Sequence, residues 1–107
     1  MNVLWSPHAE RLLDDIVIEI AIELSVDDGL RWEAKLRTAA SQLADFPNIG
    51  TAVPTECFHA VPPCADQLRQ LICKPYRIVY EVAENEIHVL SIRHSRMLVT
   101  ATDTYWN

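Results

Sequence analysis

Glycine, cysteine and long hydrophobic runs are all scarce in this sequence of 107 residues. Only two residues are glycine and half are hydrophobic, so extensive disorder is not expected. No apolar run reaches the length of a transmembrane helix, and the N-terminus lacks a signal-peptide pattern. Three cysteines are an odd number without a disulfide framework. These absences predict a cytosolic protein in a reducing compartment, and the length fits one small domain, residues 1–107.

Positive charge is also in short supply, and it is unevenly placed. The net charge is −6. Residues 1–66 carry four basic side chains against eleven acidic ones, whereas residues 67–107 carry five against four. An acidic protein repels phosphate and binds nucleic acid poorly without specific contacts. Any recognition of an anion must therefore be local.

The first half of the sequence predicts a short strand followed by two helices. Residues 2–5 form a brief apolar run that suits an edge strand. Ser6-Pro7 then supplies a capping serine and a first-turn proline, and apolar residues recur at helical spacing as far as Leu24. Ser25-x-x-Asp28 is a second capping signal, and the helix that it opens ends at Phe46-Pro47. The short connection predicts an antiparallel helical hairpin.

Three apolar residues are candidates for contact with a partner. Ile18 and Ile22 lie one turn apart on the first predicted helix but outside its core stripe. They are either additional core or a contact site, and a homodimer through them is one possibility. Trp106 lies near the C-terminus, where burial is harder to achieve. The sequence leaves these alternatives open.

The second half predicts a sheet. Residues 51–67 show no clear period and predict a loop that is long for a compact domain. Three short runs with turn signals between them follow over residues 68–96 and predict three strands. In the middle run, alternation directs one set toward the helices and the other set away: Tyr76, Ile78, Tyr80 and Val82 against Arg77, Val79 and Glu81. The order β-α-α-β-β-β predicts an α+β fold, with a small antiparallel sheet and the helical hairpin on one face.

Each of the three strands predicted over residues 68–96 carries arginine, although the chain as a whole is acidic. We expect Arg69, Arg77 and Arg96 to gather on one exposed cationic surface that meets an anionic partner. The alternative is that they pair with Glu81, Glu84 or the acidic helices, where exposed ion pairs contribute about 0–1 kcal/mol each.

The other polar candidates carry weaker signals. His94 follows an apolar strand, where a histidine is usually hydrogen-bonded and structural. Cys57-x-His59-x4-Cys64 offers three soft ligands, whereas structural zinc takes four at tighter spacing. The sequence therefore predicts no metal site, and nothing in it calls for a cofactor.

Several fragments, in this order and spacing, resemble the RelE/ParE superfamily of toxins from bacterial type II toxin–antitoxin systems. They are Trp5-Ser6-Pro7-x-Ala9, then Phe46-Pro47-x-x-Gly50 with Val53-Pro54, then Leu68-Arg69-x-Leu71, Tyr76-Arg77-Ile78-Val79-Tyr80, and Val89 through His94-Ser95-Arg96. The resemblance covers almost the whole chain and implies the family fold. RelE-like members cut messenger RNA in the ribosome without a metal, and ParE-like members poison DNA gyrase. Members of both kinds are neutralised by a partner antitoxin.

The resemblance to RelE-like enzymes is incomplete. Arg77 and Arg96 fall where those enzymes place phosphate-contacting arginines, but the pair of lysines on the strand at residues 68–73 is missing. Metal-free cleavage also needs a base, and arginine cannot easily serve because its pKa exceeds about 12. His94, His88 and Tyr105 are the only candidates for that role.

These departures favour the ParE-like branch, with a cognate antitoxin and DNA gyrase as partners and no membrane. The alternatives are a ribosome-dependent endoribonuclease and a decayed toxin fold that acts as a binding module. The nuclease alternative would use Arg69, Arg77, Arg96 and His94. The candidates for contact with a partner are Ile18, Ile22, Arg69, Arg77, Arg93, Arg96 and Trp106.

Overall fold

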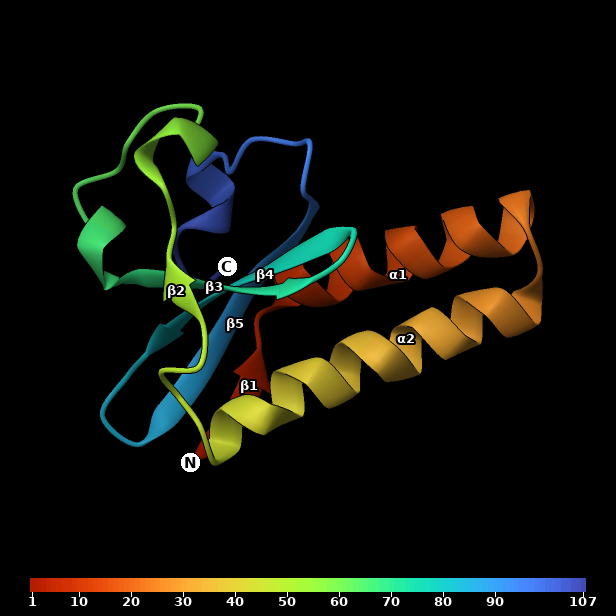
Figure 1. Cartoon of the computed structure of the whole chain (residues 1–107), viewed down its shortest axis with the longest axis horizontal. Helices are drawn as coiled ribbons and strands as arrows, with labels where there is room; N and C mark the ends of the chain where they lie inside the picture. Colours follow the sequence, from red (N-terminus) through yellow and green to blue (C-terminus); the bar gives the residue numbers. More distant parts are fainter.

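The computed structural model describes residues 1–107 and begins with the predicted strand and helical hairpin (Figure 1). Strand β1 spans Asn2–Trp5, helix α1 spans Pro7–Glu23 and helix α2 spans Val26–Ser41, with a 3₁₀ turn at Gln42–Ala44. Both predicted caps are confirmed. The hydroxyl of Ser6 accepts a hydrogen bond from the Ala9 amide, and that of Ser25 accepts one from the Asp28 amide, each at 3.0 Å.

The sheet has one strand more than predicted. Strands β3 (Leu68–Cys73), β4 (Tyr76–Val82) and β5 (Glu86–His94) form its antiparallel centre, and β2 (Thr51–Ala52) adds a short edge beside β3. The strand order is β1-β5-β4-β3-β2. Strand β1 pairs with β5 in parallel, so the sheet is mostly rather than wholly antiparallel. The predicted α+β fold is confirmed.

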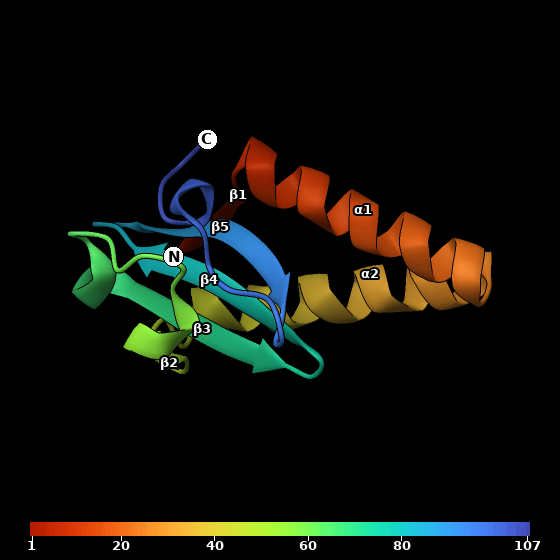
Figure 2. The same ribbon diagram turned by 90° about the horizontal axis from the view of Figure 1, so that it is seen from above.

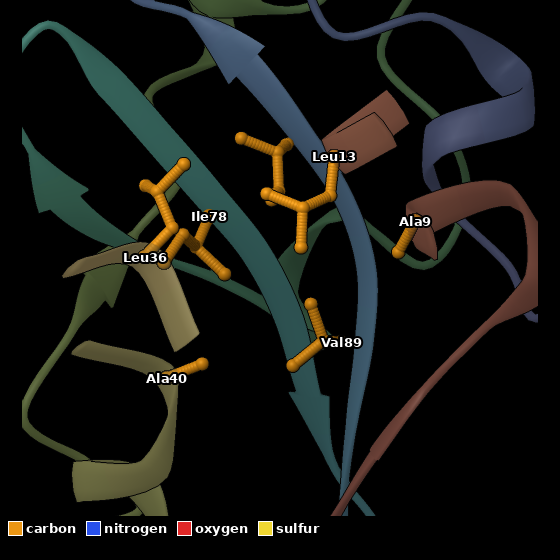
Figure 3. Close-up of a cluster of buried hydrophobic side chains, with 7 residues drawn as sticks. Ala9, Leu13, Leu36, Ala40, Ile78 and Val89 are labelled. Carbon is orange, nitrogen blue, oxygen red and sulfur yellow. The ribbon is translucent and has the colours of Figure 1, made fainter. Parts of the chain in front are cut away.

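The helices cover one face of this sheet (Figure 2). The core between the two layers is shown in Figure 3, where side chains from α1, α2, β4 and β5 meet. Its buried members are Ala9, Leu13, Leu36, Ala40, Ile78, Val89 and Ile92. Tyr76 packs against this core and Tyr80 forms a neighbouring cluster with Leu43 and Ile87, as predicted for the helix-facing side of the strand.

The opposite face of the sheet is covered as well, which the sequence did not predict. The loop 53–67 and the segment after β5 close over it and bury a second core. That core consists of Val53, Phe58, Leu68, Val79, Leu90 and Val99. An isolated parallel bridge joins Phe58 to Val99, so the two irregular segments hold each other. The long predicted loop therefore forms one wall of a core.

A bulge explains why both sides of β5 are apolar. Val79 pairs with Ser91 and Tyr80 pairs with Val89, which leaves Leu90 as an extra residue on β5. Leu90 lies in the second core, whereas Val89 and Ile92 lie in the core under the helices.

Candidate functional site

A groove of about 640 Å³ runs between α1 and the end of the β4–β5 pair. Its apolar lining comes from both layers: Leu12, Ile16, Ile20, Pro75, Tyr76, Ile92 and Met97. One rim is acidic, with the exposed side chains of Asp15, Glu19 and Glu23 on α1. The other side carries Arg93, His94 and Arg96. The groove thus has an apolar centre between walls of opposite charge.

Tyr76 is the central aromatic side chain of this groove. Its ring meets Trp32 of α2 and His94 of β5 edge to face, with centroids 5.4 and 5.8 Å apart. Burial, helped by the negative charges of Glu19 and Glu23, raises the pKa of its phenol above the usual 10.0. The hydroxyl therefore stays protonated and keeps a hydrogen-bond donor at the acidic wall.

Arg69, Arg77 and Arg96 do not form one exposed cationic surface, so that prediction is wrong. Arg77 is only 6 % exposed, and its guanidinium donates to the Gln70 side chain and the Ser95 carbonyl. Arg69 donates to the carbonyls of Asn48 and Gly50 and so ties β3 to the turn before β2. Neither pairs with a glutamate, so the ion pairs predicted as the alternative do not form for these two residues.

Arg93 and Arg96 differ in their surroundings. Arg93 makes a two-point contact with Asp103, at 2.9 Å from Nε and 3.1 Å from Nη2. Arg96 is exposed at the groove, and no carboxylate lies within ion-pair distance of it. Arg77 and Arg93 lie on the sheet face that carries the second core. The segments that cover this face are the physical reason why the predicted exposed surface does not form.

Asp103 is the centre of a buried polar cluster that sequence reasoning missed. Its fully buried carboxylate accepts hydrogen bonds from Arg93, from Ser91 at 2.7 Å and from the Thr100 amide at 2.8 Å, and His8 Nε2 lies 2.8 Å away. Burial alone would raise the pKa of this carboxyl, but the hydrogen bonds lower it from 3.8 to about 2. The capping-box spacing Thr100-x-x-Asp103 was the one signal that could have found it.

His88 and Trp106 form a smaller cluster on the sheet. Nδ1 of His88 lies 3.2 Å from the Glu81 carboxylate, and Nε2 lies 3.1 Å from the Glu86 carboxylate. The ring of Trp106 packs against the imidazole, with the two ring centroids 5.1 Å apart. Burial lowers the pKa of His88, but the two carboxylates outweigh it and raise the pKa above 6.5. Trp106 is still almost half exposed.

The remaining candidates lie apart from one another. His94 Nδ1 accepts a hydrogen bond from the Arg96 amide, which shapes the turn after β5. Ile18 and Ile22 are exposed on α1 and therefore are not core. No three histidine, cysteine or acidic side chains come together in a group that could hold a metal ion. Cys57 and Cys64 pack against the second core. None of the helices combines the length and apolar character required to cross a bilayer.

Comparisons with known proteins agree with the geometry. The fold matches a solved structure described as the chromosomal ParDE TA system from P. aeruginosa, with a TM-score of 0.71 and 22 % sequence identity. The match covers 88 % of this chain and 95 % of that chain, so the two chains share one fold over almost their whole length. No curated protein matches the sequence at a significant level.

The family follows from the sequence itself. Residues 3–99 match the model of the ParE toxin of type II toxin-antitoxin system, parDE. The chain belongs to this ParE toxin family.

Proposed function

We propose that this toxin arrests growth by inhibiting DNA gyrase, and that its cognate antitoxin silences it by binding in the groove beside α1. The observation that supports a protein target is how the arginines are used. Arg69, Arg77 and Arg93 are engaged within the fold, whereas apolar surface remains open on α1 and in the groove. Such a surface suits contact with proteins better than contact with phosphate.

The lining of the groove suits the binding of an amphipathic segment. Its centre offers aliphatic and aromatic side chains, and its two walls carry opposite charge. A helix with one apolar face, basic residues along one flank and acidic residues along the other would satisfy all three. We infer that the antitoxin supplies this segment.

The adjacent residues Met97 and Leu98 allow a matched test of the groove. Met97 lines it and Leu98 does not, although both are about half exposed. Met97→Glu should weaken antitoxin binding at least tenfold in calorimetry, because it places a carboxylate in the apolar part of the groove. Leu98→Glu is the control and should bind like the wild type. Equal affinities for the two variants would reject the groove as the binding site.

Gyrase inhibition is tested with purified components. Supercoiling of relaxed plasmid by gyrase should fall as toxin is added and should recover when the antitoxin is added in equal amount. Undisturbed supercoiling at a large excess of folded toxin would reject gyrase as the target.

A ribosome-dependent nuclease is the second candidate because Arg93, His94 and Arg96 all lie on the side of the groove opposite its acidic rim. Arg96 would contact phosphate and His94 would act as the base. Translating ribosomes mixed with the toxin should then yield cut messenger, and Arg96→Ala should abolish the cuts. Intact messenger would remove this candidate.

A further inference from the structure

The end of the helical hairpin carries an apolar surface that neither the core nor the groove uses. Its members are Ile18, Ile22, Leu24, Val26 and Leu30, and they are between 53 and 79 % exposed. Figures 1 and 2 both show this end of the hairpin projecting beyond the sheet. We call these five residues the hairpin tip. Five largely exposed aliphatic side chains within residues 18–30 are unfavourable in water unless a partner covers them.

The hairpin does not need these side chains to hold its own helices together. Gly29 packs α2 directly against α1: a Cβ there would lie 2.8 Å from the Val17 carbonyl oxygen and 3.5 Å from Ala21. The core residues Leu13 and Leu36 anchor the other half of the hairpin under the sheet. Polar residues at the tip would therefore leave the helix contact intact.

The tip is also separate from the groove on the same helix. Ile16 and Ile20 line the groove, and residues two positions away on a helix point to a different side. Ile18 and Ile22 accordingly lie outside the groove lining. An antitoxin segment seated in the groove and a partner seated on the tip would use different faces of α1.

Charge around the tip indicates what kind of partner fits. Residues 11–31 contain six carboxylates and two arginines, and one of these arginines, Arg31, is paired with Asp28. Asp14 and Asp15 lie one turn before Ile18, and the last turn of α1 has no basic residue. Two copies of this surface would bring acidic rims together, which opposes a homodimer. A segment with apolar residues between lysines or arginines is complementary.

The structure assigns the hairpin tip to contact with the toxin's target, through an apolar segment of that protein flanked by basic residues. This assignment rests on the proposed function, because it presumes that a protein target exists. It places the tip, rather than the arginine-bearing sheet, at the surface by which the toxin acts.

The test compares tip variants with matched variants elsewhere. Ile22→Ala/Leu30→Ala removes two exposed aliphatic side chains from the tip, and Ile49→Ala/Val61→Ala removes two about half-exposed ones outside it. When it is expressed without antitoxin, the tip variant should leave at least tenfold more viable cells than the wild type does. The control should arrest growth fully, and both should bind the antitoxin with wild-type affinity.

A charge variant tests the chemistry of the partner. Asp14→Lys should also weaken growth arrest because it places a positive charge beside Ile18, whereas Glu56→Lys should not. Light scattering should find a monomer for wild type and variants. Full arrest by the tip variant, stronger arrest by Asp14→Lys, or a wild-type dimer that the tip variant abolishes would each overturn the assignment.

The outcomes separate this inference from the proposed function. If the wild type arrests growth while gyrase activity is undisturbed, gyrase is rejected as the target. The role of the tip is then decided by whether the tip variant still arrests growth. Gyrase inhibition that the tip variant retains in full would reject the tip alone. A harmless wild type would overturn both.

Discussion

Replacing Asp103 with asparagine should destabilise the protein strongly. The carboxylate is fully buried and accepts hydrogen bonds from β5 and from its own turn, while His8 reaches it from α1. Asparagine keeps the size but removes the charge and turns one acceptor into a donor. Arg93, whose side chain is 16 % exposed, would lose its only carboxylate partner.

The size of the effect can be worked out in two ways. Lowering the pKa from 3.8 to about 2 corresponds to roughly 2 kcal/mol in favour of the folded state at neutral pH. Breaking a buried ion pair by removing one partner costs about 3–5 kcal/mol, because the other charge stays buried. We therefore expect Asp103→Asn to lower the free energy of unfolding by about 3 kcal/mol at pH 7.

Denaturant unfolding between pH 7 and pH 2 would test both values. The folded-state pKa of Asp103 lies below the unfolded value, so its contribution is complete above about pH 4 and is lost as the pH falls toward 2. The gap between wild type and variant should shrink over this range. Asp66→Asn, at an exposed carboxylate, is the control. A loss below about 1 kcal/mol at pH 7, or a gap that does not change with pH, would refute the reasoning.

Three other changes test separate parts of the fold. Gly50→Ala should cost roughly 1–3 kcal/mol in denaturant unfolding, because a Cβ would lie 2.5 Å from the Gln70 carbonyl oxygen; wild-type stability would contradict this packing. Ser6→Ala should cost about 1 kcal/mol and lower the thermal midpoint by several degrees, because it removes the cap of α1; an unchanged midpoint would rule out that role. His88→Gln should lose about 0.5–1 kcal/mol below pH 6. The raised pKa of His88 means that the deficit fades as the pH rises past that pKa, so a deficit that grows toward pH 8 would contradict the pairing.

Local signals in the sequence were enough to predict the helical layer. Ser6 and Ser25 are followed by apolar residues at helical spacing, and the structure has caps at both serines and helices that begin there, although α2 ends at Ser41 and not at Phe46-Pro47. Alternation in β4 also predicted that Tyr76 and Ile78 face the helices. Such signals depend on neighbouring residues only, so they are readable without knowledge of the rest of the fold.

The cover of the second sheet face could not be predicted in this way. Phe58 and Val99 come from irregular segments, and no period marks them as core. Arg77 is buried on the same sheet face, where its guanidinium bonds to the Gln70 side chain and to the carbonyl of Ser95. An arginine on a strand looks the same in sequence whether the face above it is open or closed.

The bulge at Leu90 was hidden for a related reason. It shifts the alternation of β5 by one residue, so apolar side chains appear on both faces and no period is left to interpret. Asp103 was missed because its main partners, Arg93 and Ser91, lie on a strand and its turn carries only a short capping signal.

The parallel pairing of β1 with β5 has a consequence for how the toxin is made. Strand β1 leaves the ribosome before every other element, but the strand that it needs is the last one to be translated. The contact between His8 and Asp103 can form only later still, because Asp103 lies 95 positions further along the chain. A nascent chain therefore cannot complete its sheet during most of its synthesis, and contacts between such distant positions form slowly. The two layers can therefore lock together only after the last strand has been translated, which makes completion of this fold a late event.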